Sequence, residues 1–310
     1  MSEKKRDKNF KVRFIADFRR NKQLYIMMIP IMLFFIIFSY LPMYGAIIAF
    51  KDYRPGRGFM GSEWVGLKHF IRFFTAPSFG KVLGNTVKIS LSTLVFGFPA
   101  PIVLALLMNE ISNKKFVKVV QNFTYMPHFI SMVVMCGMIT DFTRSNGLIG
   151  NIVSFFGGEP VSLLNYPQYF LPVYVVSNIW EGIGWGSIIY LAALTGVDRQ
   201  LYEAAEIDGA GRFKQMLHIT LPGITPTIVT MLVLRMGQIL SVGYEKIILL
   251  YNEANRSAAD VISSYVYRQG LLDANFSYSA AVGLFNSVVN FTLVICANAL
   301  NKKLRGESLW

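Results

Sequence analysis

Charged residues are scarce in this 310-residue sequence. Asp, Glu, Lys and Arg together make up 15% of it, whereas average globular proteins carry about 25%. Hydrophobic residues make up 53%, and uncharged stretches recur along the chain. This composition excludes an ordinary soluble domain and predicts a polytopic membrane protein.

Acidic residues are the scarcer of the charged types. Asp and Glu number 18 against 30 Lys and Arg, so the formal net charge is +12 at pH 7. Such an excess is typical of nucleic-acid-binding domains, which need a basic face on a soluble domain, and of membrane proteins with basic residues on one side. Because the composition excludes a soluble domain, we expect a lipid bilayer around the chain and no nucleic-acid partner.

Cysteine and histidine are also rare, and common catalytic motifs are missing. Cys136 and Cys296 both fall in apolar stretches, which excludes a disulfide scaffold and a CxxC metal or redox site. The three histidines are too scattered to suggest a metal site. The sequence contains no G-x-x-x-x-G-K-[ST] phosphate loop, no H-E-x-x-H and no G-x-S-x-G. We therefore expect a non-catalytic chain that binds no metal or cofactor of its own.

Six long apolar segments could each cross a bilayer, since about 20 apolar residues suffice for a transmembrane helix. The first, Leu24 to Phe50, is uncharged and too long for the apolar region of a signal peptide. Prolines interrupt several segments, which membrane helices tolerate when neighbouring helices pack against them. The sequence predicts an all-α integral membrane protein with six transmembrane helices. The expected spans are 24–50, 87–108, 119–140, 169–195, 223–244 and 279–300.

The distribution of basic residues predicts the orientation. With six spans, both termini lie on one side, together with loops 109–118 and 196–222, and these segments hold 18 of the 30 Lys and Arg. The opposite loops hold 10, and Lys88 and Arg235 fall within spans. By the positive-inside rule, we expect both termini in the cytoplasm. The domains are then a basic tail (1–23), a membrane domain (24–300) and a second tail (301–310).

The N-terminal tail has an amphipathic pattern. Phe10, Phe14, Ile15 and Phe18 recur at helical spacing with basic residues around them. This pattern favours a helix lying on the anionic cytoplasmic leaflet. A disordered basic tail is the alternative.

The loop at 196–222 differs from its surroundings because it is rich in acidic and small residues. Asp198 is a candidate N-cap, so we expect a short helix from there to Gly209 or Gly211, and a second from Ala210 towards a break at Pro222. Lipid contact does not explain these polar and small residues. A soluble protein partner explains them more simply.

The residues of this loop resemble a known motif. Glu203-Ala204-Ala205-x-x-x-Gly209-Ala210, followed by Ile219-x-Leu221-Pro222, is similar to the EAA loop in permease subunits of binding-protein-dependent type I ABC importers. Met216 departs from the pattern, which often has Phe there, but Met fills a similar apolar socket. Outside the loop, Asn85-Thr86, Trp180 with Gly184-Trp185, and Asp260 to Arg268 resemble the oligosaccharide and polysaccharide branch.

The resemblance implies a division of labour. A separate ABC ATPase dimer would bind ATP and Mg²⁺, a second permease subunit would complete the pathway as a heterodimer, and an extracellular solute-binding protein would deliver an oligosaccharide. The chain would lie in a bacterial plasma membrane and couple mechanically to the ATPase through its EAA loop. The implied ATPase-coupling residues are Glu203, Ala204, Ala205, Asp208, Gly209, Ala210, Phe213 and Met216.

Two charged residues, Glu181 and Arg235, fall near the middle of the expected fourth and fifth spans. A charge at that depth costs roughly 2.5–3.5 kcal/mol, which favours pairing or exposure to a wet cavity. An ion pair between them and a contact with substrate are both consistent with the sequence. Trp180, Trp185 and Asn286 are further pathway candidates, although aromatic and amide side chains also pack helices together. Gly182-x-x-x-Gly186 would allow a close helix approach.

Two other functional classes remain open at the level of sequence. A secondary transporter could use Glu181 and Arg235 to couple an ion or proton gradient to transport. That class leaves loop 196–222 unexplained. A membrane-embedded enzyme would need a cluster of catalytic groups at one depth, and none is evident.

Overall fold

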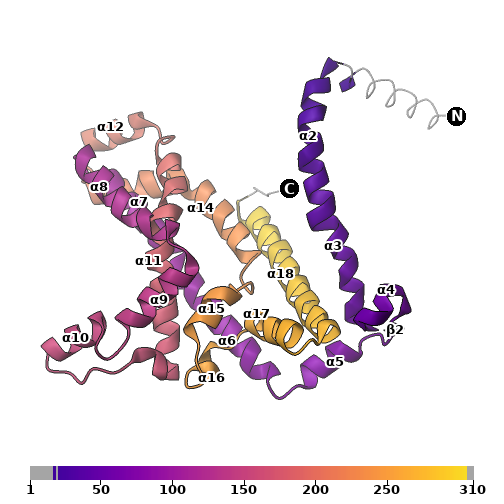
Figure 1. The fold of residues 1–310 in the computed structure, drawn as a ribbon. Helices are drawn as coiled ribbons and strands as arrows, with labels where there is room; N and C mark the ends of the chain where they lie inside the picture. The colour runs from indigo at the N-terminus through magenta and orange to yellow at the C-terminus, as the bar shows by residue number, and fades with distance from the viewer. Residues whose placement is uncertain (1–16, 19, 306–310) are drawn as a thin grey trace. The chain divides into compact units, whose positions relative to one another are not determined.

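The computed structural model describes residues 17–18 and 20–305, and the chain divides into two units, Met1–Leu67 and Lys68–Trp310 (Figure 1). The tails expected at 1–23 and 301–310 lie largely outside the described residues, so the expected interfacial helix stays a prediction.

Unit 1 consists of one long apolar helix and a small hairpin. The helix runs over Lys22–Phe50, 29 residues long enough and apolar enough to cross a membrane. No residue of its first segment is buried, so its apolar surface faces outward. The hairpin pairs Lys51 with Trp64 in antiparallel register. The elements are α2 (Lys22–Phe35), η1 (Ile36–Tyr40), α3 (Leu41–Met43), η2 (Tyr44–Phe50), β1 (Lys51–Asp52), η3 (Pro55–Arg57), α4 (Gly58–Gly61) and β2 (Glu63–Trp64).

The regular elements of unit 2 are all helices in its described residues. Its first half contains α5 (Lys68–Thr75), α6 (Phe79–Ser92), η4 (Thr93–Gly97), α7 (Pro99–Glu110), α8 (Lys114–Tyr125), η5 (Met126–Phe129), α9 (Met132–Phe142), α10 (Leu148–Phe155), η6 (Leu163–Asn165) and α11 (Pro167–Leu194). Its second half contains α12 (Arg199–Ile207), α13 (Arg212–Gln215), η7 (Met216–Thr220), α14 (Leu221–Met236), α15 (Tyr244–Leu250), α16 (Arg256–Ala259), α17 (Ile262–Tyr267), η8 (Arg268–Leu272) and α18 (Phe276–Arg305).

Among the described residues, four helices have the length and hydropathy of membrane spans. They are Lys22–Phe50, Phe79–Glu110, Arg212–Met236 and Phe276–Lys303. The expected third span is bent by 105° between α8–η5 and α9, so it would be a fifth span only if the bent pair is counted as one. The expected fourth span is α11, a continuous helix of 28 residues. Its apolar sequence is interrupted by polar residues such as Asn178 and Glu181.

Prolines shape these helices without ending them. We expected the chain to break at Pro222, but Arg212–Met236 is one continuous helix. The turn η7 before Pro222 is a π-turn in which the Leu221 N–H donates to the Met216 carbonyl. The turns η1 and η4 lie in the same position before Pro42 and Pro99. A π-turn inserts one extra residue, and such turns are among the recognised causes of distortion inside helices.

The expected fifth span, 223–244, is wrong at its C-terminal end. α14 stops at Met236 instead of continuing to residue 244. Asn290 of α18 holds the following turn, because its side chain accepts from the Leu240 N–H at 3.1 Å and donates to Ser241 Oγ at 2.9 Å. The chain then folds back as α15.

Three clusters of buried side chains hold unit 2 together. The largest joins α6, α9, α11 and α15 and includes Phe170, Ile247 and Met135. A second joins α5, α6, α17 and α18 around Phe73 and Tyr278. A third joins α7, α11 and α14 around Tyr190 and Ile224. Within unit 2, Figure 1 shows α12 at one end and α16, α17 and α5 at the other.

Candidate functional site

The first candidate site is the segment 198–214, which we call the finger. Asp198 caps α12, because its side chain accepts a hydrogen bond from the Gln200 N–H at 2.9 Å. The helix ends at Ile207 and is followed by Gly209, whose φ of +74° lies in the left-handed region that favours glycine. The Ala210 N–H then donates to the Ala205 carbonyl at 2.8 Å. A short helix was expected from Asp198 to Gly209 or Gly211, and the structure has one over Arg199–Ile207.

The outer surface of the finger is exposed. Glu203, Ala204, Asp208 and Gly209 are exposed, while Ala205, Ala210 and Met216 are partly buried. Two large apolar side chains also point outward: Ile207 is 87% exposed and Phe213 68%. Aromatic residues such as Phe are enriched at the core of protein interfaces, so the exposed Phe213 favours a protein-binding role for this surface.

The root of the finger, by which we mean Val197 and residues 215–223 on either side of it, is fixed to the core of unit 2. The Tyr202 hydroxyl and the buried Thr220 hydroxyl lie 2.8 Å apart. Met216 packs against the third cluster, and Gly223 lies so close to Val197 that a Cβ there would be 2.9 Å from its Cγ2. Movement of the finger would therefore act on α14 directly.

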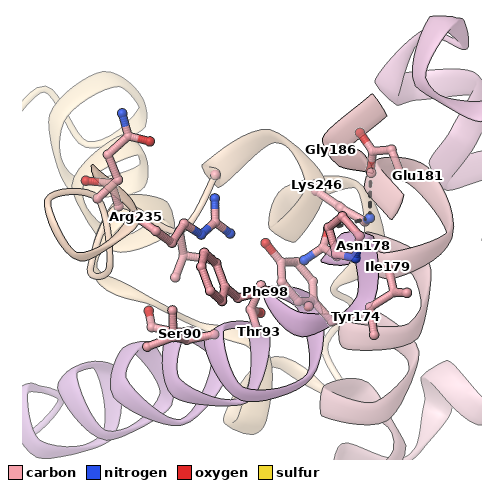
Figure 2. A pocket seen from close by; sticks show the side chains of 18 of the residues that line it. Ser90, Thr93, Phe98, Tyr174, Asn178, Ile179, Glu181, Gly186, Arg235 and Lys246 are labelled. Carbon is pink, nitrogen blue, oxygen red and sulfur yellow. Dashed lines mark hydrogen bonds and ion pairs between the residues drawn. The ribbon is translucent and has the colours of Figure 1, made fainter. Parts of the chain in front are cut away.

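The second candidate site is a cavity of about 680 Å³ within unit 2, which we call the central cavity. It lies between α6–η4, α11, the end of α14, and α15 (Figure 2). Its volume is in the range of small-molecule sites, about 300–1,000 Å³. Apolar groups contribute most of its surface, and its polar lining residues are Ser90, Thr93, His128, Tyr174, Asn178, Glu181, Tyr190, Arg235, Gln238, Ser241, Tyr244, Glu245 and Lys246.

Glu181 pairs with Lys246, and not with Arg235 as one interpretation of the sequence suggested. The Lys246 ammonium donates to Glu181 Oε2 at 2.9 Å and to Asn178 Oδ1 at 2.7 Å. Lys246 is only 3% exposed, although the sequence placed it in an external loop. The error follows from the early end of α14, since the returning α15 carries Lys246 back beside α11.

Arg235 also lines the central cavity, but in a different setting. It lies in the last turn of α14 and not in the middle of a span. No described acidic residue forms an ion pair with it. Figure 2 shows its guanidinium extending into the space between α14 and the Lys246–Glu181–Asn178 group.

The other pathway candidates are placed away from the lining. Trp180 and Asn286 are not among the cavity-lining residues. Trp185 stacks on His128 with ring centroids 4.7 Å apart, and His128 does line the cavity. The Asn286 carbonyl oxygen Oδ1 is buried without a hydrogen-bond partner in the described part of the chain.

At the end of unit 2 opposite the finger, two sequence motifs meet. The Asn85 amide donates to the carbonyls of Ser257 and Asp260, each at 3.0 Å, and the Thr86 hydroxyl accepts from the Ile262 N–H at 2.9 Å. Asp260 also forms an ion pair with Arg268, in which Arg268 Nη2 donates to Asp260 Oδ2 at 2.6 Å and Nη1 donates to Oδ1 at 3.2 Å.

Burial by itself lowers the pKa of Arg268, but the bonds to Asp260 more than offset that effect, so the net pKa shift is upward. Together these bonds hold segment 255–272 onto α6. They account for the pattern from Asp260 to Arg268 as a structural element.

The described residues contain no group of three His, Cys, Asp or Glu side chains arranged to hold a metal ion.

Comparison with known proteins settles the family. A family model described as "Binding-protein-dependent transport system inner membrane component" matches residues 24–306. The chain belongs to this family. It is therefore a transport permease subunit of a bacterial plasma membrane, and the family assignment favours neither a secondary transporter nor a membrane enzyme.

Relatives of this inner membrane component include the "Polygalacturonan/rhamnogalacturonan transport system permease protein YteP" of Bacillus subtilis (strain 168). The two are 47% identical over 96% of this chain and 93% of the relative. A subunit of a bacterial ABC transporter involved in the import of the acidic polysaccharide alginate matches with a TM-score of 0.87, 42% identity, and coverage of 94% of this chain and 99% of that one. A second structure, of an alginate ABC transporter in complex with an alginate pentasaccharide-bound periplasmic protein, matches with a TM-score of 0.87 and 41% identity, over 95% of this chain and 99% of that one.

Sequence reasoning about this inner membrane component missed several residues of interest. The residues around Lys246 do not indicate that it is buried, because its burial depends on the fold of the preceding turn. Ile207 is an apolar residue at the end of a polar helix, and this contrast could have marked it as a surface contact. Serine and threonine are common in membrane helices, so the sequence alone did not show that Ser90 and Thr93 lie in the cavity.

Proposed function

We propose that this chain is one of two permease subunits of an ATP-driven importer, forms half of the pathway for a saccharide, and couples to a separate ATPase through the finger. The observation that carries the proposal is the exposed finger joined directly to the cavity. Arg212–Met236 is a single helix of 25 residues. It would be about 37 Å long, and it begins in the finger and ends beside Arg235.

The mechanism follows from that connection. ATP-driven closure of an ATPase dimer would displace the docked finger, and the helix would carry the displacement to the central cavity. Met216, where the finger joins this helix, is packed against the third cluster, so the movement would be passed on to α14. The cavity would then open alternately to the two sides of the membrane, as in other transitions driven by rigid-body movement.

The membrane topology is part of the proposal. We count α11 and the bent pair α8–α9 as spans, which makes six with both termini in the cytoplasm. α11 has the required length, and its polar residues Asn178 and Glu181 line the cavity, where contact with lipid is avoided. The basic residues of the loops support the orientation.

The saccharide substrate is proposed from the relatives, which are named as transporters of polygalacturonan and rhamnogalacturonan and of alginate. An extracellular solute-binding protein would deliver it, and the second permease subunit would be a different chain. ATP and Mg²⁺ would be bound by the ATPase, with no cofactor bound by this chain. An ion-coupled mechanism has less support, because Glu181 is already paired with Lys246.

The proposal is tested with the assembled transporter in liposomes, by measuring ATP hydrolysis and saccharide uptake for Gly209→Asp. A Cβ at Gly209 would meet no atom within 4 Å, so the change adds only the backbone strain of a positive φ, about 1 kcal/mol. We expect the variant to fold and insert but to lose the coupling of uptake to ATP hydrolysis.

Gly157→Asp is the matched control. Gly157 is also exposed, has a φ of +81°, and a Cβ added to it would likewise meet no atom within 4 Å. Its variant should therefore carry the same strain and keep normal uptake. Coupled uptake at the wild-type rate by Gly209→Asp would refute the role of the finger.

A further inference from the structure

The charges of the central cavity are unequally satisfied. Lys246 and Glu181 neutralise each other, and Asn178 accepts a further hydrogen bond from the ammonium. Glu245 lies in the first turn of α15, where a negative charge is favourable beside the helix N-terminus. Arg235 is the cavity cation for which the described residues provide no carboxylate.

The wall formed by α6 and η4 carries hydroxyl groups without partners. Ser90 is 7% exposed, and the hydroxyls of Ser90 and Thr93 are buried with no hydrogen-bond partner among the described residues. Both residues line the cavity, and Figure 2 shows them on the helix below Arg235. Buried polar groups are normally hydrogen-bonded, so each is an available contact for a ligand hydroxyl.

We propose that Arg235 binds the carboxylate of an acidic sugar, so that the transported substrate is a uronate-containing oligosaccharide. This inference rests on the proposed function and identifies the substrate class. A guanidinium matches a carboxylate with two parallel N–H···O bonds, a geometry that an ammonium does not reproduce. The Ser90 and Thr93 hydroxyls would bond to the hydroxyls of the same ligand, and the apolar lining would contact the faces of its rings.

The position of Arg235 links this binding to the transport cycle. It lies in the last turn of the helix that begins in the finger. A displacement of the finger would therefore move the group that holds the carboxylate, and would change its fit to the substrate. The ion pair of Lys246 with Glu181 comes from other elements and would stay in place as a fixed wall.

Binding is measured on the permease assembled with its partner permease and ATPase in lipid nanodiscs, without a solute-binding protein. The probes are a galacturonate trisaccharide and its fully methyl-esterified form, which has the same rings without the charges. We expect the wild-type complex to bind the acid more tightly than the ester. Arg235→Gln should weaken binding of the acid by about ten- to a hundredfold and leave binding of the ester unchanged.

Two variants control for folding and for general electrostatics. Arg235→Lys keeps the charge but cannot form the two parallel N–H···O bonds. We therefore expect an intermediate loss of affinity for the acid, and this variant can be measured even if Arg235→Gln assembles poorly. Arg144→Gln removes an exposed charge outside the central cavity and should bind both probes as the wild type does. Equal affinity of the wild type for the two probes, or unchanged acid binding by both Arg235 variants, would overturn the inference.

Uptake with ATP and the binding protein separates this inference from the proposed function. If the wild type imports a saccharide but the Arg235 variants import it equally well, only the inference fails. If the wild type imports no saccharide, the proposed function fails, and the nanodisc measurement still decides whether Arg235 binds the carboxylate.

Discussion

The ammonium of Lys246 lies 2.9 Å from the carboxylate of Glu181, across 65 positions of sequence. The two side chains are 3% and 25% exposed, so the lysine is the more deeply buried partner. This ion pair ties α15 to the middle of α11 and closes one side of the central cavity. It also replaces the Glu181–Arg235 pair that the sequence suggested.

Removing either partner of this pair alone should lower the stability of the protein, whereas removing both together should change it little. Lys246→Met should destabilise the protein by about 1–2 kcal/mol, because Glu181 keeps partial access to cavity water, whereas Glu181→Leu should cost about 3 kcal/mol because it leaves a buried ammonium. In the double variant the two apolar side chains pack together, and stability should return close to that of the wild type. Thermal unfolding in detergent measures all three, and additive losses would contradict the prediction.

Local features of the finger were predictable from sequence, whereas the contacts of Lys246 were not. The ends of α12 depend on capping by Asp198 and on the positive φ of Gly209, which are properties of neighbouring residues. The position of Lys246 depends on a turn held by Asn290, which is distant in sequence. Hydropathy alone extended the fifth span past Met236, because the residues after it are also mostly uncharged.

Glycine spacing illustrates the same limit. Gly182-x-x-x-Gly186 suggested a close approach, yet a Cβ at Gly182 would meet no atom within 4 Å. Among these three glycines of α11, the closest approach is at Gly184, where a Cβ would overlap the Thr124 carbonyl oxygen of α8. At Gly186 the nearest atom is the Pro101 side chain at 3.0 Å. Which glycine is needed depends on where α8 crosses α11, and a pattern within one helix does not contain that information.

Gly184→Ala should therefore destabilise the protein. The added methyl group would overlap backbone atoms that cannot rotate away, and overpacking of this kind costs about 1–3 kcal/mol. Gly182→Ala is the control on the same helix, and it should be neutral or slightly stabilising, because alanine favours the helical backbone. Unfolding of the two variants in detergent gives the comparison, and an equal loss for both would show that the helix contact does not matter.

The exposed apolar residues of the finger should matter for assembly and not for folding. Ile207→Ser and Phe213→Ser remove side chains that are 87% and 68% exposed, so stability should change by less than about 0.5 kcal/mol. If these residues contact the ATPase, each change should weaken its association by about tenfold or more. Co-purification and titration of the ATPase measure this effect.

Phe156→Ser is the matched control for the finger, since Phe156 is 82% exposed and lies outside it. Its variant should retain the ATPase fully. Loss of the ATPase from Phe156→Ser to the same degree would mean that surface hydrophobicity in general, and not the finger, governs association.

Thr86 should be important for holding segment 255–272 onto α6. Its fully buried hydroxyl donates to the Val82 carbonyl and accepts from the Ile262 N–H. Thr86→Val keeps the shape but leaves that buried N–H without an acceptor, which costs about 1–3 kcal/mol. Thr143→Val is the control, because the Thr143 hydroxyl is also buried but accepts no backbone N–H and donates only to the carbonyls of Ile139 and Thr140 in its own helix. We expect faster amide hydrogen exchange at Ile262 in Thr86→Val alone. Unchanged exchange there would mean that the segment is held by Asn85 and the buried side chains without Thr86.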